Sequence, residues 1–234
     1  VTINMAAGVH RPRPIAQQPG NYAWYMTNSV TATGSVTLQG ATSATWLTMH
    51  GLTGLTVTAH QVGSNDPYLD FAGTPFAGLE LRGFFAVLST GQIIPIHGHT
   101  SSRLQVTKNL SPAPTNGVTT VAVMRPSTIM RNTLNDIALS HAIGWNLRNI
   151  PGGGSNLWQD LTLEDFASSG MVYATDCSVN LTRCCVDSLT YTQAPLSKPA
   201  SGFTTLLRAA DSGSFGFTDS TVRSNPTTGG VGGI

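Results

Sequence analysis

Residues 79–88 read LELRGFFAVL and form the clearest β-strand pattern in the chain. One face of such a strand carries Leu79, Leu81, Gly83, Phe85 and Val87. Glu80 and Arg82 lie on the other face, which becomes apolar from Phe84 onward. A strand that is apolar on both faces in its second half is expected to be covered on both sides. The stretch therefore predicts a β-rich core.

Shorter segments rich in β-branched and aromatic residues recur along the chain at intervals of roughly ten residues. They are 22–26, 35–39, 55–59, 93–96, 104–106, 118–124, 170–174 and 188–193. Gly and Pro residues separate them, which is typical of turns between short strands. We predict a mainly β fold: an antiparallel β-sandwich, jelly-roll-like, with one or two short helices.

The main predicted helix lies near residues 128–148. Ser127 can cap a run whose apolar positions repeat at three and four residues. The run consists of Met130, Leu134, Ile137, His141 and Trp145. A second helical turn is predicted after Thr162, because Thr162 to Asp165 has the spacing of a capping box.

The sequence divides into three regions that differ in residue composition. Residues 1–20 contain three prolines and predict an extended N-terminal arm, and residues 21–210 predict the sandwich domain. Residues 211–234 form a polar C-terminal tail that should be ordered only if other chains hold it. Its expected anchors are Phe215, Phe217 and Val222. The first residue is Val1, and we expect either that a precursor was cleaved or that the chain is a fragment of a longer one.

The chain carries few charges, and they are nearly balanced. Only 23 of 234 residues are charged, 12 of them basic and 11 acidic. Ordinary soluble domains carry roughly 25% charge, so a surface this neutral is expected to be covered by neighbouring subunits. The basic residues are scattered singly, which predicts that contact with nucleic acid is indirect or weak. No apolar run is long enough to span a membrane.

The candidate for metal chemistry is the segment GQIIPIHGH at 91–99. His97 and His99 should share one face of a strand. The segment resembles half of the metal-binding motif of the cupin family, in which a Glu follows four or five positions later. Here Arg103 and Leu104 stand in its place. We assign no metal, no cofactor and no catalytic residue, and interpret the two histidines as a half-exposed pair at a β-edge whose contacts respond to pH.

Three cysteines, Cys177, Cys184 and Cys185, lie within nine residues. An odd number leaves at least one thiol unpaired in a monomer, and a bond between adjacent cysteines on a strand would be strained. A zinc site would need a fourth ligand. We therefore expect buried free thiols.

The texture of the whole chain resembles the coat (capsid) proteins of small icosahedral viruses, of the jelly-roll type. The features that carry the resemblance are Thr-, Ser- and Gly-rich short strands, a Pro-bearing arm, the missing initiator Met, low charge and a polar tail. It implies a structural protein of the virion that is cut from a polyprotein, self-assembles into an icosahedral shell and encloses the genome. The implied partners are copies of itself, related coat subunits and a host receptor.

Two other classes of protein remain open. One is a cell-surface or fibre module such as an adhesin, which would fold alone as a monomer or trimer and keep its fold without the tail. The other is a cupin-like enzyme, which would need metal at His97 and His99. The coat-protein hypothesis predicts no enzymatic activity.

Overall fold

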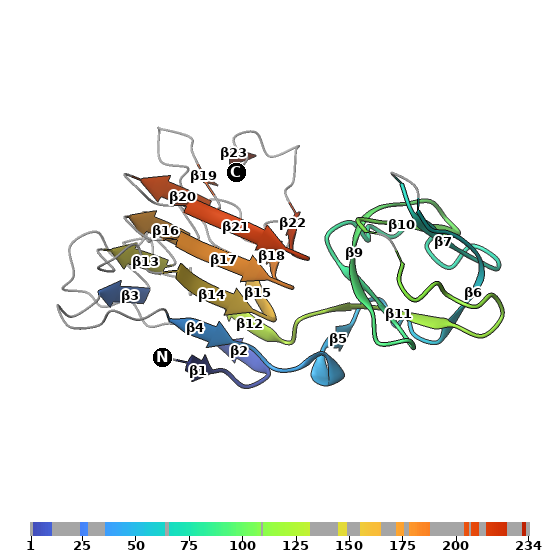
Figure 1. Ribbon diagram of the computed structural model, residues 1–234, viewed down its shortest axis with the longest axis horizontal. Coiled ribbons are helices and arrows are strands. Elements are labelled where there is room, and N and C mark those ends of the chain that lie inside the picture. The colour runs from blue at the N-terminus through green and yellow to red at the C-terminus, as the bar shows by residue number, and fades with distance from the viewer. Residues whose placement is uncertain are drawn as a thin grey trace. The chain divides into compact units, whose positions relative to one another are not determined.

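The chain folds into two units, seen in the computed structural model (Figure 1). The described residues are 2–10, 24–27, 36–63, 66–108, 110–131, 145–148, 155–164, 172–175, 178–187, 204–205, 207–210, 214–223 and 231–232. The first unit comprises Val1–Thr45 and Pro126–Ile234, and the second comprises Trp46–Arg125. The second unit is therefore an insertion within the first.

The first unit is built from three parallel sheets. Sheet A contains β1 (Thr2–Asn4), β4 (Thr37–Gln39), β14 (Ser155–Gln159), β17 (Ser178–Thr182) and β21 (Ser214–Thr218). Sheet B contains β2 (Gly8–His10), β12 (Thr128–Arg131), β15 (Leu161–Glu164), β18 (Cys185–Asp187) and β22 (Thr221–Arg223). Sheet C contains β3 (Trp24–Thr27), β13 (Trp145–Arg148), β16 (Val172–Thr175) and β20 (Leu207–Ala210). A short parallel pair joins β19 (Thr204–Thr205) to β23 (Val231–Gly232).

The order of these strands makes the first unit a parallel β-solenoid. The chain passes from sheet A to sheet B to sheet C and then returns to sheet A one level further along, where the next strand pairs with the previous one. We call each such level a rung. Five rungs begin at β1, β4, β14, β17 and β21 (Figure 1). Because each rung is hydrogen-bonded to the next, apolar residues at equivalent positions stack along the interior.

One stack of apolar side chains runs the length of sheet A. The strand register aligns Ile3, Leu38, Trp158, Leu181 and Phe217. We call this set the core column. Its three middle members are 0–1% exposed, whereas Ile3 is 43% exposed and Phe217 is 37% exposed. The interior of the solenoid is therefore closely packed between rungs.

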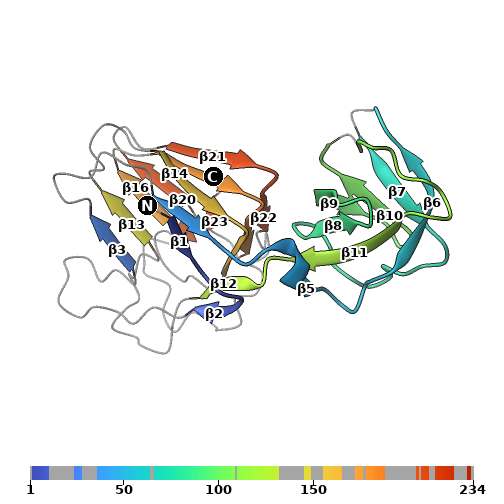
Figure 2. The same cartoon turned by 60° about the horizontal axis from the view of Figure 1, so that its bottom comes forward.

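The second unit is a closed antiparallel barrel. Its six strands are β6 (Leu55–Gln61), β7 (Tyr68–Phe71), β10 (Arg103–Val106), β9 (Ile93–His99), β8 (Phe85–Leu88) and β11 (Thr120–Arg125), and β11 pairs with both β6 and β8 to close the ring. A seventh strand, β5 (Leu47–Thr48), pairs with β11. Figure 2 shows β6, β7 and β10 side by side. Closure removes the open sheet edges that would otherwise invite pairing with other chains.

The barrel has a hydrophobic core of its own. The fully buried members of that core include Val57, Leu69, Leu81, Ile94 and Leu104. Two contacts join the solenoid segments on either side of the insertion. Ala41 N donates to Thr128 Oγ1 at 2.9 Å. Thr45, at the end of a 3-10 turn (Ser43–Thr45), has its Oγ1 3.5 Å from Ser127 Oγ. The chain thus leaves and rejoins the solenoid at neighbouring points.

The prediction of a mainly β fold is confirmed, but the predicted antiparallel, jelly-roll-like sandwich is not. The barrel is antiparallel, whereas sheets A, B and C are parallel, so residues 21–210 do not form one antiparallel sandwich. Alternation of polar and apolar residues reports a strand and not its direction.

Both helix predictions fail where the structure tests them. Strands β12 and β13 occupy the two ends of the predicted helix at 128–148, and residues 132–144 lie outside the described residues. The residues from Thr128 to Met130 are at most 4% exposed, so both faces of β12 are covered, and strands buried on both faces lose their alternation. Thr162 belongs to β15 and donates its hydroxyl proton to the Pro126 carbonyl at 2.8 Å instead of capping a helix.

The predicted boundaries also differ from the structure. Strands β1 and β2 lie within the predicted arm, and β21 and β22 within the predicted tail, so both ends contribute rungs to the solenoid of their own chain. Of the stretch 79–88, only Phe85–Leu88 is a strand. Gly83 adopts a φ of 84°, which turns the chain before the strand begins.

The described part of the chain holds no helix with the length and apolar character needed to cross a membrane.

The separate core of the barrel predicts that it folds without the solenoid. A fragment of residues 46–125 should give a dispersed amide NMR spectrum and a single cooperative urea transition. The complementary chain, with Thr45 joined to Pro126 through a short Gly-Ser linker, should keep its β circular dichroism. A collapsed, poorly dispersed spectrum for the barrel fragment would show that the two units depend on each other.

Candidate functional site

The two candidate histidines lie on β9 of the barrel, where the strand is irregular. Gly98 pairs with Gln105 and Ile96 with Val106, so His97 is the extra residue of a β-bulge. The bulge breaks the alternation that would have placed His97 and His99 on one face. The prediction that they share one face of the strand is therefore wrong.

His97 lies on the outer surface, with its side chain 45% exposed. Its Nε2 is 3.2 Å from Oδ1 of Asp66, and Gln105 donates to the other oxygen of that carboxylate at 3.1 Å. Asp66 thus links β9 to β10 outside the barrel core.

His99 is more enclosed, with its side chain 14% exposed. The Leu81 amide donates to its Nε2 at 3.3 Å, and Oε1 of Glu80 lies 3.8 Å from the same atom. A neutral imidazole can accept the Leu81 proton, whereas a protonated one loses this acceptor and faces the Glu80 carboxylate instead. His97 and His99 therefore lie beside different carboxylates, Asp66 and Glu80 respectively.

Arg103 is fully engaged beside these histidines. Its guanidinium donates to both oxygens of Asp70, at 2.6 and 2.8 Å, and lies 3.6 Å above the centre of the Tyr68 ring. The register of β7 and β10 aligns Arg103 with Asp70. The ion pair raises the pKa of Arg103, chiefly through these hydrogen bonds. A cation at the position of the expected acid disfavours binding of a metal ion.

We name the outer side chains of this region the polar strip. It consists of Asp66, Tyr68, Asp70, His97, Arg103 and Gln105. Within the described residues, no three His, Cys, Asp or Glu side chains lie close enough together to hold a metal ion. The strip offers amide and phenol groups to a polar ligand, and its Arg103 is already paired with Asp70. It is suited to binding at a surface more than to acid-base or nucleophilic chemistry.

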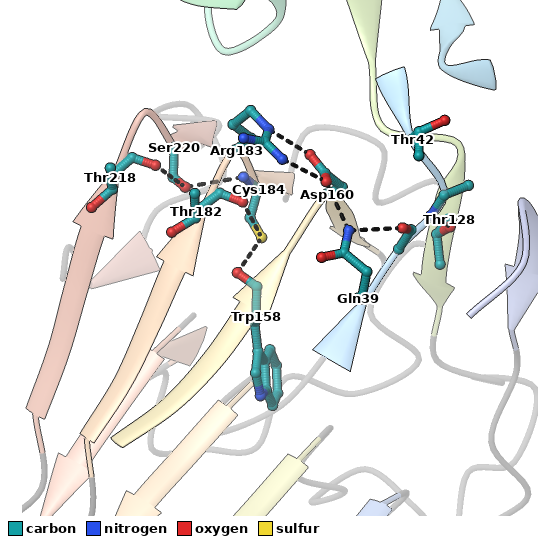
Figure 3. A network of polar contacts seen from close by, with 12 residues as sticks. Gln39, Thr42, Thr128, Trp158, Asp160, Thr182, Arg183, Cys184, Thr218 and Ser220 are labelled. Atoms are coloured by element: carbon teal, nitrogen blue, oxygen red, sulfur yellow. Dashed lines mark hydrogen bonds and ion pairs between the residues drawn. The ribbon is translucent and has the colours of Figure 1, made fainter. Parts of the chain in front are cut away.

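A second polar cluster lies in the solenoid, at the turn from sheet A to sheet B (Figure 3). Asp160, Arg183 and Asp219 occupy equivalent positions in successive rungs and have φ values of 58°, 50° and 48°. We call them the turn column. Asp tolerates this left-handed conformation better than Arg does, so Arg183 needs a local partner.

That partner is Asp160, whose side chain is only 4% exposed. Arg183 donates to both of its oxygens at 2.7 Å, and Gln39 donates to the same carboxylate at 2.9 Å (Figure 3). The ion pair raises the pKa of Arg183. Gly40 lies one rung away, where a Cβ atom would come within 2.1 Å of the Asp160 carbonyl oxygen. The cluster joins three rungs, and its groups face one another instead of a ligand.

The expectation that the thiols are buried and form no disulfide is confirmed for Cys184 and Cys185, which are both 0% exposed, while Cys177 lies outside the described residues. The Cys184 thiol donates to the Trp158 carbonyl at 3.3 Å (Figure 3). Burial raises its pKa to about 12, which keeps the thiol protonated and unreactive.

Comparisons with known proteins assign no family to this chain. No family model matches it, and no curated protein matches it. One solved structure found is Gp54, the tailspike of Acinetobacter baumannii bacteriophage AP22, in complex with A. baumannii capsular saccharide. The two chains are 7% identical with a TM-score of 0.28, and the alignment covers 92% of this chain and 41% of the tailspike. A likeness this weak does not establish a shared fold, and we take neither fold nor function from it.

Glu80 provides a test of the electrostatics at the edge of the barrel. Hydrogen bonds from the Arg82 side chain are the largest cause that lowers the pKa of Glu80 to about 2. Because the folded pKa lies below the ordinary value, this carboxylate stabilises the fold above about pH 4.5 and loses that contribution as the pH falls toward 2. Arg82→Gln should raise the pKa toward 4.5 in an NMR titration of the Glu80 carboxyl carbon.

His99→Gln is the matched control for this titration. His99 makes the smallest of the contributions that lower the Glu80 pKa, so its replacement should move that pKa less than Arg82→Gln does. Equal shifts from both variants would contradict the assignment.

The solenoid ion pair should matter more to stability than the exposed pair on the barrel. Replacing Asp160 with Asn removes the carboxylate that accepts two hydrogen bonds from Arg183. This carboxylate is 4% exposed and the Arg183 side chain is 30% exposed, so we expect the free energy of unfolding to fall by about 2–3 kcal/mol. The Glu80–Arg82 pair has side chains 41% and 66% exposed, so Arg82→Gln should cost about 0–1 kcal/mol. Urea titrations followed by circular dichroism measure both, and equal costs would show that burial does not govern these pairs.

Proposed function

We propose that this chain is a non-enzymatic structural module of a multi-chain fibre, with the parallel solenoid as its rod and the barrel as an inserted binding module. The observation that carries the proposal is the unbroken register of five rungs across the insertion. A solenoid is extended by adding rungs, because each rung contacts only its neighbours. Such a fold is suited to elongated assemblies.

The outer face of sheet A supports association with other chains. The residues that alternate with the core column along its strands carry no formal charge: Thr2, Asn4, Thr37, Gln39, Leu157, Gln159, Asn180, Thr182, Gly216 and Thr218. The cores of protein interfaces are depleted of charged residues, so an uncharged sheet face is suited to contact between subunits. The low charge of the whole chain agrees with this role.

The barrel supports the second half of the proposal. It has its own core, a closed set of strands and an outer strip of paired polar groups. An inserted unit of this kind can present a surface while the register of the rod continues. The fibre or adhesin class therefore fits the fold better than the cupin-like enzyme, since His97 and His99 are directed to separate carboxylates.

The coat-protein hypothesis stays a prediction of the sequence, and both classes require assembly. They differ in the shape of the particle, since a coat protein closes a shell and a fibre module forms rods. Light scattering on the purified chain, with electron microscopy of the same sample, should show particles of many chains that are elongated. Closed shells would support the coat protein instead, and single chains of 24.5 kDa at every concentration would contradict both.

A further inference from the structure

We propose that protonation of His99 moves this side chain from the Leu81 amide to the Glu80 carboxylate, and so releases the middle of the segment that joins β7 to β8. The device lies wholly within the barrel and does not depend on the fibre proposal. It is built from the two ring nitrogens of His99 and from the hydrogen bonds that hold the segment on either side of Leu81.

The segment consists of residues 77–82, which we call the strap. Its two ends are anchored by hydrogen bonds to carbonyl oxygens, which do not titrate: Phe76 N donates to Ser101 O at 3.0 Å, and Gly83 N donates to Ile96 O at 2.9 Å. Between these anchors the Leu81 amide donates to Nε2 of His99 at 3.3 Å. The Leu81 side chain is 0% exposed and belongs to the barrel core. A titratable group therefore holds the strap at its buried middle.

The neutral form of His99 matches this contact. Its Nδ1 lies 3.3 Å from the Thr100 carbonyl oxygen, to which a protonated nitrogen can donate. A neutral imidazole carries a single N–H, so with the proton on Nδ1 its Nε2 is free to accept the Leu81 amide. Protonation of Nε2 uses up that lone pair. The Leu81 amide then loses its acceptor.

A second partner for the protonated ring is already in place. Oε1 of Glu80 lies 3.8 Å from Nε2 of His99. The pKa of Glu80 is lowered to about 2, so its carboxylate is ionised throughout the range in which histidine titrates. Arg82 holds this carboxylate beside the ring by donating to both of its oxygens, at 2.9 and 2.6 Å. Protonated His99 therefore gains an ion pair on the strap as it loses the amide.

The other charged groups around His99 are engaged elsewhere. On the same strand, His97 lies beside Asp66 on the outer surface. On β10, which pairs with β9, Arg103 donates to both oxygens of Asp70. Glu80 is thus the carboxylate to which a protonated His99 turns.

The exchange is local, because the two anchors of the strap do not titrate. The Leu81 amide opens, while the new ion pair offsets the lost hydrogen bond and the barrel core stays packed. Glu80 and Arg82 are 41% and 66% exposed, so the change in their pairing reaches the surface of the barrel. Acid therefore alters this part of the barrel surface without unfolding the unit.

The test is amide hydrogen exchange in the full chain, measured by NMR at pH 8 and pH 5, the range in which histidine changes charge. The protection factor of the Leu81 amide should fall about tenfold at the lower pH, because a buried amide loses its acceptor. The control is the Val57 amide, which donates to the Thr119 carbonyl at 2.9 Å and should keep its protection. An equal fall at Val57 would mean that the whole barrel opens, and it would overturn the local exchange.

Two matched variants assign the response to one histidine. His99→Gln keeps an acceptor oxygen near the position of Nε2 but does not titrate, so the Leu81 protection factor should be the same at both pH values. His97→Gln removes the neighbouring histidine and should retain the fall. A fall that persists in His99→Gln, or one that His97→Gln abolishes, would overturn the proposal.

A measurement on the unsubstituted chain keeps the test decisive if circular dichroism shows that His99→Gln does not fold. The nitrogen chemical shifts of the His99 ring report its protonation directly. The Leu81 amide resonance should shift with the same midpoint as these ring nitrogens. Different midpoints, or a Leu81 amide that does not respond, would contradict the exchange of partners.

Discussion

Register between rungs depends on one repeated constraint, the turn that carries the chain from sheet A to sheet B. In three successive rungs the turn residue is held in the left-handed region, and its amide or that of its neighbour continues the ladder of hydrogen bonds between rungs. The buried pair of Asp160 and Arg183 joins two of these turns, and Gln39 ties in a third rung. A one-residue slip would separate these partners and turn the core column toward solvent. Polar contacts at the turn thus specify the position at which the apolar interior can pack.

The insertion shows how local that constraint is. Between β4 and β12 the chain leaves to build an entire barrel, yet β4 still pairs with β14 and β12 with β15 in the register of the rung. Thr128 Oγ1 receives the Ala41 amide and donates to the Ala6 carbonyl, which fixes the position where the chain returns. Because neighbouring rungs supply the pairing, the loop between two strands of one rung is free to vary in size. A whole unit such as the barrel can therefore be inserted without altering the solenoid.

The sequence predicts strands well and their organisation poorly, for reasons that particular segments make clear. The segments LWQDLTLE (157–164), NLTRCCVD (180–187) and GFTDSTVR (216–223) share an inward apolar residue, a polar residue and then the turn residue. This repeat is visible in the sequence, but its turn residues are 23 and then 36 positions apart, and the barrel interrupts the rung before them. Thr128–Arg131 were predicted as the start of a helix but form β12, because a strand buried on both faces carries apolar residues without alternation. At the candidate site, His97 and His99 were found from their spacing, while the bulge that separates them leaves no mark in the sequence.

Disulfide trapping between rungs tests the parallel register most directly. Gln159 and Thr182 are register partners on adjacent strands, where Cα atoms lie about 5 Å apart and a disulfide can form. Gln159 and Thr218 lie two rungs apart, beyond the reach of a disulfide at about 10 Å. Under mild oxidation, Gln159→Cys with Thr182→Cys should form an intramolecular bond, identified by peptide mass spectrometry, and Gln159→Cys with Thr218→Cys should not. A bond in the second pair and none in the first would contradict the stacked rungs on which the account rests.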